Sequence, residues 1–245
     1  MAIVDASSGT RVEEIADGIF QIHLPVAPEG ASPPQFSFNQ YLIVDDEPLL
    51  FHTGPRRMFE RVRDAIAHVL PVQRLRHIVY SHCESDECGA MNQLLAVAPA
   101  ARAATGAIGA MVNGDLFDRP LAALADGEAL CVGRHTLRWL DAPHLPHGWD
   151  CGFLVEESTR TLLCGDLFTQ PGGGAATPAL TTSDVLEAAE RMRRAGTLDY
   201  FARAPDSRQL LEKLARTAPT TLACMHGSAW SGDGAAMLRR LAEKV

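Results

Sequence analysis

Four side chains able to bind a cation lie within the six residues 82–87. His82, Glu84 and Asp86 alternate with a spacing of two, which on an extended segment directs them to one side, and Glu87 follows directly. An imidazole nitrogen combined with clustered carboxylate oxygens suits a pair of hard or borderline cations. A solvated acidic turn after a strand would contain the same residue types, so this segment alone leaves both interpretations open.

Three later segments each place a further ligand-type side chain in a loop or at a strand end. His144 and His147 flank a Leu-Pro pair, and Asp166 and His226 each follow an apolar, strand-like run. Taken singly, such residues are more typical of a capping aspartate or a hydrogen-bonded core histidine. Together with the first segment, they make a metal site the better hypothesis.

The predicted secondary structure places these segments at strand ends. A hairpin is expected where Asp17-Gly18 interrupts an apolar run, since Asp-Gly is a strong turn signal. Pro55 opens a helix whose apolar residues recur at helical spacing. Strands are predicted at residues 12–25 in two runs, 38–44, 48–53, 76–82, 129–140 as a hairpin, 152–156, 161–164 and 220–225. Helices are predicted at residues 55–69, around 91–95, and at about 183–195, 206–215 and 234–245.

Strands followed by helices occur twice along the chain, which predicts two sheets between two helical layers. The expected fold is therefore α/β (α+β), as a four-layer αββα sandwich. A chain of 245 residues with 47% hydrophobic content can bury one full core. A single domain over residues 1–245 is expected.

The composition argues against several classes of partner. The chain carries 22 Lys+Arg against 30 Asp+Glu, a net charge of −8, so it lacks the basic excess of a nucleic-acid or anionic-membrane surface. No apolar run approaches the length of a membrane span, and the N-terminus lacks a secretory signal pattern. The six cysteines form no CxxC pair and are expected to be free or buried thiols. A cytoplasmic location is expected.

The order His-x-Glu-x-Asp, then His, then strand-Asp, then strand-His-Gly resembles the metallo-β-lactamase superfamily. More narrowly, it is similar to the oxygen-binding diiron domain of the flavodiiron proteins. Zinc hydrolases of the superfamily carry His-x-His-x-Asp-His at the first motif, whereas the flavodiiron branch has Glu at the second position, as this chain has Glu84. Residues 38–44, 165–170 and 226–230 resemble that branch as well, and the resemblance extends from about residue 12 to the end.

The resemblance implies a ligand set for two metals. His147 is preferred to His144 because the family's ligand stands three residues before an aspartate, here Asp150, which leaves His144 as a loop or supporting residue. The implied ligands are His82, Glu84 and His147 for the first metal, Asp86 and His226 for the second, and Asp166 as the bridge.

The sequence departs from the family pattern at three places. Glu87 replaces the usual histidine, and is expected either to bind the second metal or to leave a position open. His52-Thr53 stands where Asp-Thr is usual, and no flavodoxin domain follows before Val245, so no flavin is expected in this chain.

The implied function is redox chemistry at two iron ions, with manganese or zinc as alternatives. Four carboxylates, those of residues 84, 86, 87 and 166, balance two divalent ions, and carboxylate ligands favour harder metals. The expected ligand is O2, NO or a peroxide, bound by a reductase or by a sensor. A reductase would need a separate flavoprotein or rubredoxin-type electron donor, and the family implies a homodimer. The alternative is a metallohydrolase of esters, thioesters or lactones.

Overall fold

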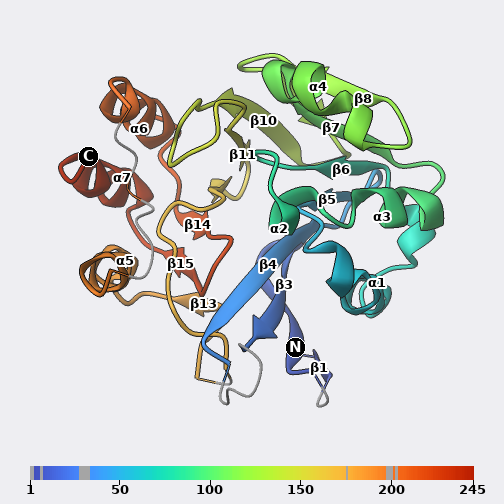
Figure 1. Ribbon diagram of the computed structural model, residues 1–245, viewed down its shortest axis with the longest axis horizontal. Helices are drawn as coiled ribbons and strands as arrows, with labels where there is room; N and C mark the ends of the chain where they lie inside the picture. The colour runs from blue at the N-terminus through green and yellow to red at the C-terminus, as the bar shows by residue number, and fades with distance from the viewer. Residues whose placement is uncertain (1–2, 6–7, 28–33, 175, 197–200, 202–203) are drawn as a thin grey trace.

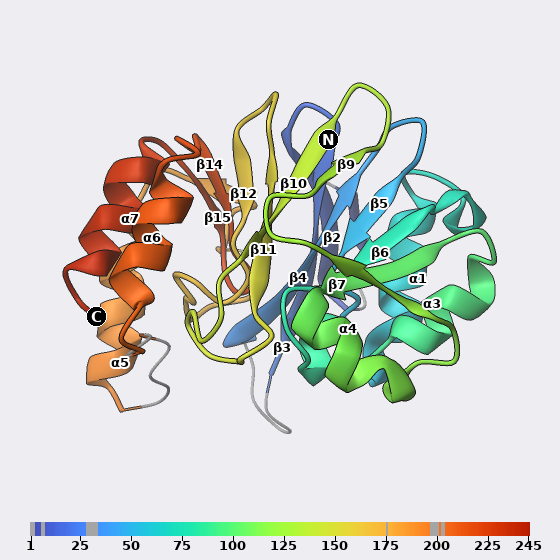
Figure 2. The ribbon, with the colours of Figure 1, turned by 90° about the horizontal axis from the view of Figure 1, so that it is seen from above.

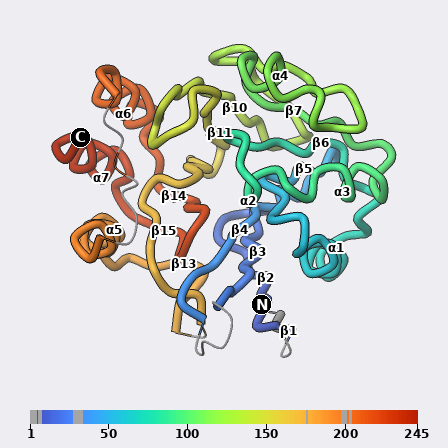
Figure 3. The backbone as a smooth tube through the Cα atoms, viewed as in Figure 1, coloured from blue at the N-terminus to red at the C-terminus, as the bar shows by residue number. Residues whose placement is uncertain are grey.

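Two β-sheets lie face to face between two layers of helices in the computed structural model (Figures 1 and 2). The structure describes residues 3–5, 8–27, 34–174, 176–196, 201 and 204–245. The first half of the chain builds one sheet with its helices, and the second half builds the other (Figure 3). The predicted αββα sandwich is confirmed.

The first sheet is antiparallel at its N-terminal edge and parallel from β5 onward. Its strands, in spatial order, are β1 (Ile3–Asp5), β2 (Thr10–Ala16), β3 (Ile19–Val26), β4 (Phe36–Ile43), β5 (Leu49–Phe51), β6 (His77–Val79), β7 (Arg102–Gly106) and β8 (Leu121–Leu124). The helices of this half are α1 (Phe59–Ala67), α2 (Ser85–Cys88), α3 (Met91–Val97) and α4 (Ala107–Asn113), with 3-10 turns at Arg56–Met58, Val72–Arg74 and Gly114–Leu116.

The second sheet pairs β12 with β14 in parallel, and it is covered by α5, α6 and α7 on its outer face (Figure 2). Its strands, in spatial order, are β13 (Leu180–Thr181), β15 (Ala229–Ser231), β14 (Thr221–Ala223), β12 (Thr161–Leu163), β11 (Gly152–Glu156), β10 (Thr136–Asp141) and β9 (Ala129–Cys131). The covering helices are α5 (Val185–Arg194), α6 (Ser207–Ala215) and α7 (Gly234–Ala242).

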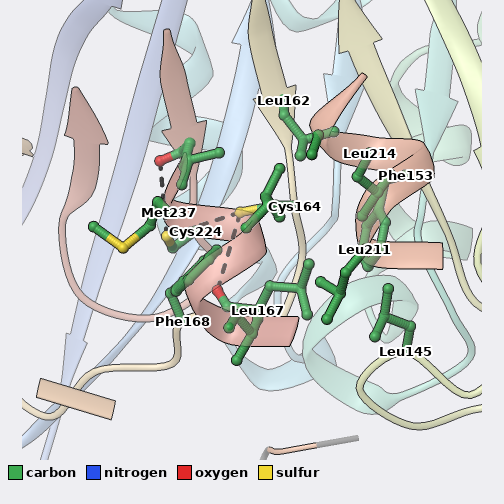
Figure 4. Close-up of a cluster of buried hydrophobic side chains, with 14 of the residues drawn as sticks. Leu145, Phe153, Leu162, Cys164, Leu167, Phe168, Leu211, Leu214, Cys224 and Met237 are labelled. Carbon is green, nitrogen blue, oxygen red and sulfur yellow. Dashed lines mark hydrogen bonds between the residues drawn. The ribbon is translucent and has the colours of Figure 1, made fainter. Parts of the chain in front are cut away.

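The core consists of three apolar layers that follow from this arrangement. One lies between the first sheet and α1 and α3, and one between the two sheets, where Tyr41 and Trp139 are fully buried. The third lies between the second sheet and its helices, and it includes Cys164 and Cys224 (Figure 4). Each strand in the middle of the sandwich therefore has apolar residues on both faces.

Local sequence signals explain most element boundaries. Gly18 turns the β2–β3 hairpin with a φ of +66°, as the Asp-Gly pair predicts. Asp184 and Asp233 accept hydrogen bonds from backbone N–H groups in the first turns of α5 and α7. The helix predicted from Pro55 begins as a 3-10 turn, so α1 proper starts four residues later.

The elements between residues 102 and 124 were not predicted from the sequence. Strand β7 (RAATG), helix α4 (AIGAMVN) and strand β8 (LAAL) are rich in alanine and glycine. Alanine and glycine are neither strongly apolar nor polar, so these segments lack the regular alternation by which a helix or a strand is recognised in a sequence. These elements form because β7 pairs in parallel with both β6 and β8. Within the described residues, no helix is long and apolar enough to cross a membrane.

A buried carboxylate fixes the tight turn between β11 and β12. Glu156 accepts hydrogen bonds from the hydroxyl and backbone N–H groups of Ser158 and Thr159, at 2.6–3.1 Å. Burial alone would raise the pKa of Glu156, but the hydrogen bonds from Thr159 and Ser158 outweigh it and lower the pKa to about 2. The ionised form of Glu156 therefore stabilises the folded state.

We expect Glu156→Gln to lower the free energy of unfolding at neutral pH by about 1–3 kcal/mol. The folded pKa lies below the unfolded value of 4.5, so the stabilisation is present above that pH and is lost as the pH falls through about 2. Urea titrations of both proteins should show their difference shrinking between those pH values. A difference that stays constant with pH would contradict this role.

Candidate metal centre

Parallel strands deliver three ligand-type side chains to the same edge of the sandwich. Leu163 and Ala223 are paired in register in β12 and β14, and Asp166 and His226 each lie three residues beyond that pair. His82 lies at the same distance beyond the end of β6 in the other sheet. The carboxyl ends of the strands therefore place these side chains where the two sheets face each other.

A first group of ligand atoms surrounds a single point. His82, Glu84, His147 and Asp166 each offer one atom, and these atoms all lie within 4.8 Å of one another. The two Nε2 atoms of His82 and His147 are 3.1 Å apart. Two nitrogens bound to one metal ion at about 2.1 Å each cannot lie more than about 4.2 Å apart. The imidazoles are thus spaced as ligands of one ion would be.

A second group lies beside the first. Glu84, Asp86 and Glu87 each offer an oxygen, again within 4.8 Å of one another. His226 points its Nε2 at Asp86 Oδ2, 3.6 Å away, and at Asp166 Oδ1, 3.0 Å away. The second group is therefore richer in carboxylates than the first.

Asp166 connects the two groups through its separate oxygens. Its Oδ2 lies 3.1 Å from His147 Nε2 and 3.5 Å from His82 Nε2. Its Oδ1 faces His226 on the other side. The side chain is only 2% exposed. This is the geometry expected of a carboxylate that bridges two cations.

Histidines and carboxylates of the two groups shift one another's pKa values. Hydrogen bonds to Asp166 and then Glu84 raise the pKa of His147 to about 10. Burial alone would raise the pKa of Asp166, but the hydrogen bonds from His147 and His226 hold it well below its usual range. At neutral pH, His147 is therefore protonated, and metal binding must displace that proton.

Glu87 is fully buried, and among the described residues no hydrogen-bond donor satisfies either of its carboxylate oxygens. Burial, followed by the neighbouring charges of Asp166 and Asp86, raises the pKa of Glu87 well above its ordinary value. A buried carboxylate is costly unless a cation or donor compensates it. The departure from the usual histidine thus adds to the second cluster a buried acidic group, which in its protonated form donates a hydrogen bond to Asp86.

Hydrogen bonds fix the orientation of two buried histidines of the ligand set. His226 donates its Nδ1–H to the Ser37 carbonyl oxygen at 2.8 Å, which turns Nε2 toward Asp86 and Asp166, and the Phe36 ring stacks on it with centroids 4.4 Å apart. His82 Nδ1 lies 2.9 Å from Ser81 Oγ. Contacts of this kind select the tautomer that presents Nε2 to a metal.

His52, which stands where the family usually has aspartate, extends this network. Its Nε2 lies 3.0 Å from Ser81 Oγ, so His82 Nδ1–H can donate to Ser81, whose hydroxyl can donate to His52. Burial lowers the pKa of His52 well below its usual value, which keeps Nε2 available as an acceptor. The substituted residue thus supports His82 through one intervening hydroxyl.

Strand β4 holds the turn that carries His226. Asn39 donates from its side-chain amide to the carbonyl oxygens of Cys224 and Gly227, at 2.9 and 2.8 Å. Ser37, Ser81 and Asn39 were not singled out as supporting residues from the sequence. A serine next to a ligand histidine, or an asparagine within an apolar strand, is the signal that could have identified them.

The two histidines of the Pro-kinked loop occupy different environments. His147 belongs to the first group, whereas His144 is exposed and lies outside both groups of the described residues. Asp150 accepts hydrogen bonds from Cys83 N and Asn113 Nδ2, each at 3.0 Å, and so ties this loop to the first ligand segment. The structure thus brings together all six predicted ligands and Glu87, but not His144.

The ligand side chains differ in their exposure to solvent. The side chains of Glu84 and His147 are 50% and 34% exposed, whereas those of His82, Asp166 and His226 are 2% exposed. A small molecule can therefore approach past Glu84 and His147. The arrangement suits two cations bridged by a carboxylate, with a small ligand reaching them from that side.

Comparison with known proteins agrees with this geometry. The family model "ODP family beta lactamase" matches residues 36–227. The rubredoxin-oxygen oxidoreductase of Megalodesulfovibrio gigas is 25% identical over 213 residues, covering 82% of this chain and 51% of that protein. The nitric oxide reductase of Moorella thermoacetica is 26% identical over 209 residues, covering 80% and 50%. The chain thus spans about half the length of these curated relatives.

The fold agreement extends over almost the whole chain. The structure of rubredoxin oxygen:oxidoreductase from Desulfovibrio gigas superposes with a TM-score of 0.77 at 21% identity, covering 95% of this chain and 61% of that one. The resemblance to flavodiiron proteins expected from the ligand order is confirmed. The chain belongs to the family described as ODP family beta lactamase.

Proposed function

We propose that this protein holds two iron ions and binds O2, NO or a peroxide there. The observation that carries the proposal is the buried Asp166 carboxylate, whose two oxygens face separate groups of ligand atoms. The names of the relatives, a rubredoxin-oxygen oxidoreductase and a nitric oxide reductase, support O2 and NO as the ligands.

The side chains present fit two divalent cations. Glu87 carries buried oxygens that no described donor satisfies, and a metal would compensate them. Four carboxylates, those of Glu84, Asp86, Glu87 and Asp166, would balance the charge of two divalent ions. An oxygen-rich ligand set favours iron or manganese over zinc and weakens the Lewis acidity that hydrolysis requires.

Each side chain has a distinct task in this proposal. His82, Glu84 and His147 would hold the first ion, Asp86, Glu87 and His226 the second, and Asp166 would bridge them. When bound, the ions would supply the redox chemistry and the coordination positions for a diatomic ligand. The buried ligands exclude bulk water, and the exposed Glu84 and His147 leave access for a small molecule.

We further propose that the electrons come from a separate flavoprotein or rubredoxin-type donor. The name of the Megalodesulfovibrio gigas relative supports a rubredoxin-type protein. Residues 1–245 would act as a single domain, and assembly as a homodimer is part of the same proposal. A sensor of O2 would use the same ligands without rapid re-reduction.

We expect the protein purified without added metal to contain about two irons per chain, since the ligand set forms two groups. Exposing the reduced protein to air should increase near-ultraviolet absorbance. His147→Ala should remove at least half of the iron, whereas His144→Ala should leave it unchanged. Plasma emission measures the metals. Two zincs per chain with no response to air would contradict the proposal and favour an esterase.

Glu87→Gln should have opposite effects on metal-free and metal-loaded protein. Because burial and neighbouring carboxylates raise the pKa of Glu87, its ionisation destabilises the metal-free fold increasingly as the pH rises above 4.5. The variant should therefore melt at a higher temperature when metal-free, and bind the second metal at least ~10-fold more weakly. Calorimetric melting and metal titration measure both effects. Unchanged affinity for the second metal would show that Glu87 is not a ligand.

Ser81→Ala should weaken metal binding without removing a ligand. The Nδ1–H of His82 would lose its acceptor, and such losses lower metal affinity by about 10–100-fold. Competition with a chelator measures the affinity. Ser85→Ala is the matched control, since Ser85 is exposed in the same segment and should leave the affinity unchanged. Equal behaviour of the two variants would contradict the supporting role of Ser81.

A further inference from the structure

We propose that Cys83 and Cys88 form a dithiol that reduces hydroperoxides and becomes a disulfide. Their Sγ atoms lie 3.8 Å apart at the two ends of the segment that carries Glu84 and Glu87. The sequence offered no CxxC pair, and the turn of α2 is what brings these thiols together. The proposal concerns the thiols alone and does not depend on which metal the centre holds.

The backbone around the two cysteines is already closed into a turn. Cys88 N donates to the Glu84 carbonyl oxygen at 3.0 Å, and the Cys88 thiol lies 3.1 Å from the same oxygen. Cys83 is anchored by its own N–H, which donates to Asp150. A disulfide has an S–S length of about 2.05 Å, so the sulfurs must approach by about 1.8 Å.

The two cysteines differ in exposure but border the same cavity. They line a cavity of about 710 Å³, together with Arg56, Glu84 and Asn92. Cys83 is partly exposed, whereas Cys88 is buried behind it. A small peroxide entering this cavity would therefore meet Cys83 first, and Cys88 would be the resolving thiol.

A second pair of neighbouring cysteines differs from Cys83 and Cys88 in its access to solvent. Cys164 and Cys224 are also close, with Sγ atoms 3.9 Å apart, but both are fully buried in the core beneath α6 and α7 (Figure 4). Cys131 is exposed but has no cysteine partner among the described residues. Only Cys83 and Cys88 of the described cysteines combine a near partner with access to a cavity.

The reaction consumes one hydroperoxide and forms one disulfide. The Cys83 sulfur attacks the peroxide, the O–O bond breaks, and a sulfenic acid forms as water or an alcohol leaves. The Cys88 sulfur then attacks Cys83, which forms the S–S bond and releases the sulfenic oxygen as water. The two thiol protons end on the two leaving oxygens, and the two sulfurs lose the two electrons that the peroxide gains.

The test uses hydrogen peroxide as the probe on the protein as purified. We expect about one equivalent to produce a Cys83–Cys88 disulfide, found by alkylation and peptide mass spectrometry, and dithiothreitol to restore both thiols. Cys83→Ser and Cys88→Ser should each abolish the disulfide. Cys131→Ser is the matched control and should react as the unchanged protein does.

Peptide mapping of the unchanged protein shows whether the Cys83–Cys88 disulfide forms, even if a serine variant folds poorly. Over-oxidation of Cys83 to a sulfinic acid while Cys88 stays a free thiol would overturn the proposal. Oxidation of Cys164 and Cys224 as fast as the proposed pair would overturn it as well, because access could then not be the deciding feature. Protection of both core cysteines during disulfide formation would support it.

Discussion

The burial of the Asp166 carboxylate is the constraint on which the centre depends. An ionised carboxylate taken out of water costs several kcal/mol unless close partners compensate it. Here His147 and His82 face one oxygen and His226 faces the other. His147 and His226 follow strands of the second sheet, as Asp166 does, whereas His82 follows β6 of the first, so the full set of partners forms only when both sheets are in place. In the proposed metal-bound state, cations would replace the His147 proton as the positive charge that compensates Asp166.

Both sheets position ligand side chains in the same way. Loops that follow β6, β12 and β14 carry His82, Asp166 and His226, and the register of parallel strands places them at one edge. Contacts across the sandwich then hold these loops, since Asn39 of β4 binds the turn around His226. The same packing that forms the core therefore also sets the distances between the ligand atoms.

The first ligand segment combines two kinds of chemistry in a few residues. Glu84, Asp86 and Glu87 lie in or beside α2, Cys88 is the last residue of that helix, and Cys83 lies two residues before its start. Glu84 borders both the ligand groups and the cavity that the thiols line. A short helix thus serves two purposes, because its inner side presents carboxylates to the centre while its ends bring two sulfurs together.

The sequence by itself determined the αββα class, the family and the residues that converge at the centre, because ligand types and their order along the chain are local properties. It did not determine β7, α4 and β8, whose alanine-rich sequences form strands and a helix through pairing with neighbours. Tertiary structure alone linked His52 to His82 through Ser81 and brought Cys83 beside Cys88. These are distances between side chains, and they exist only once separate segments have packed together.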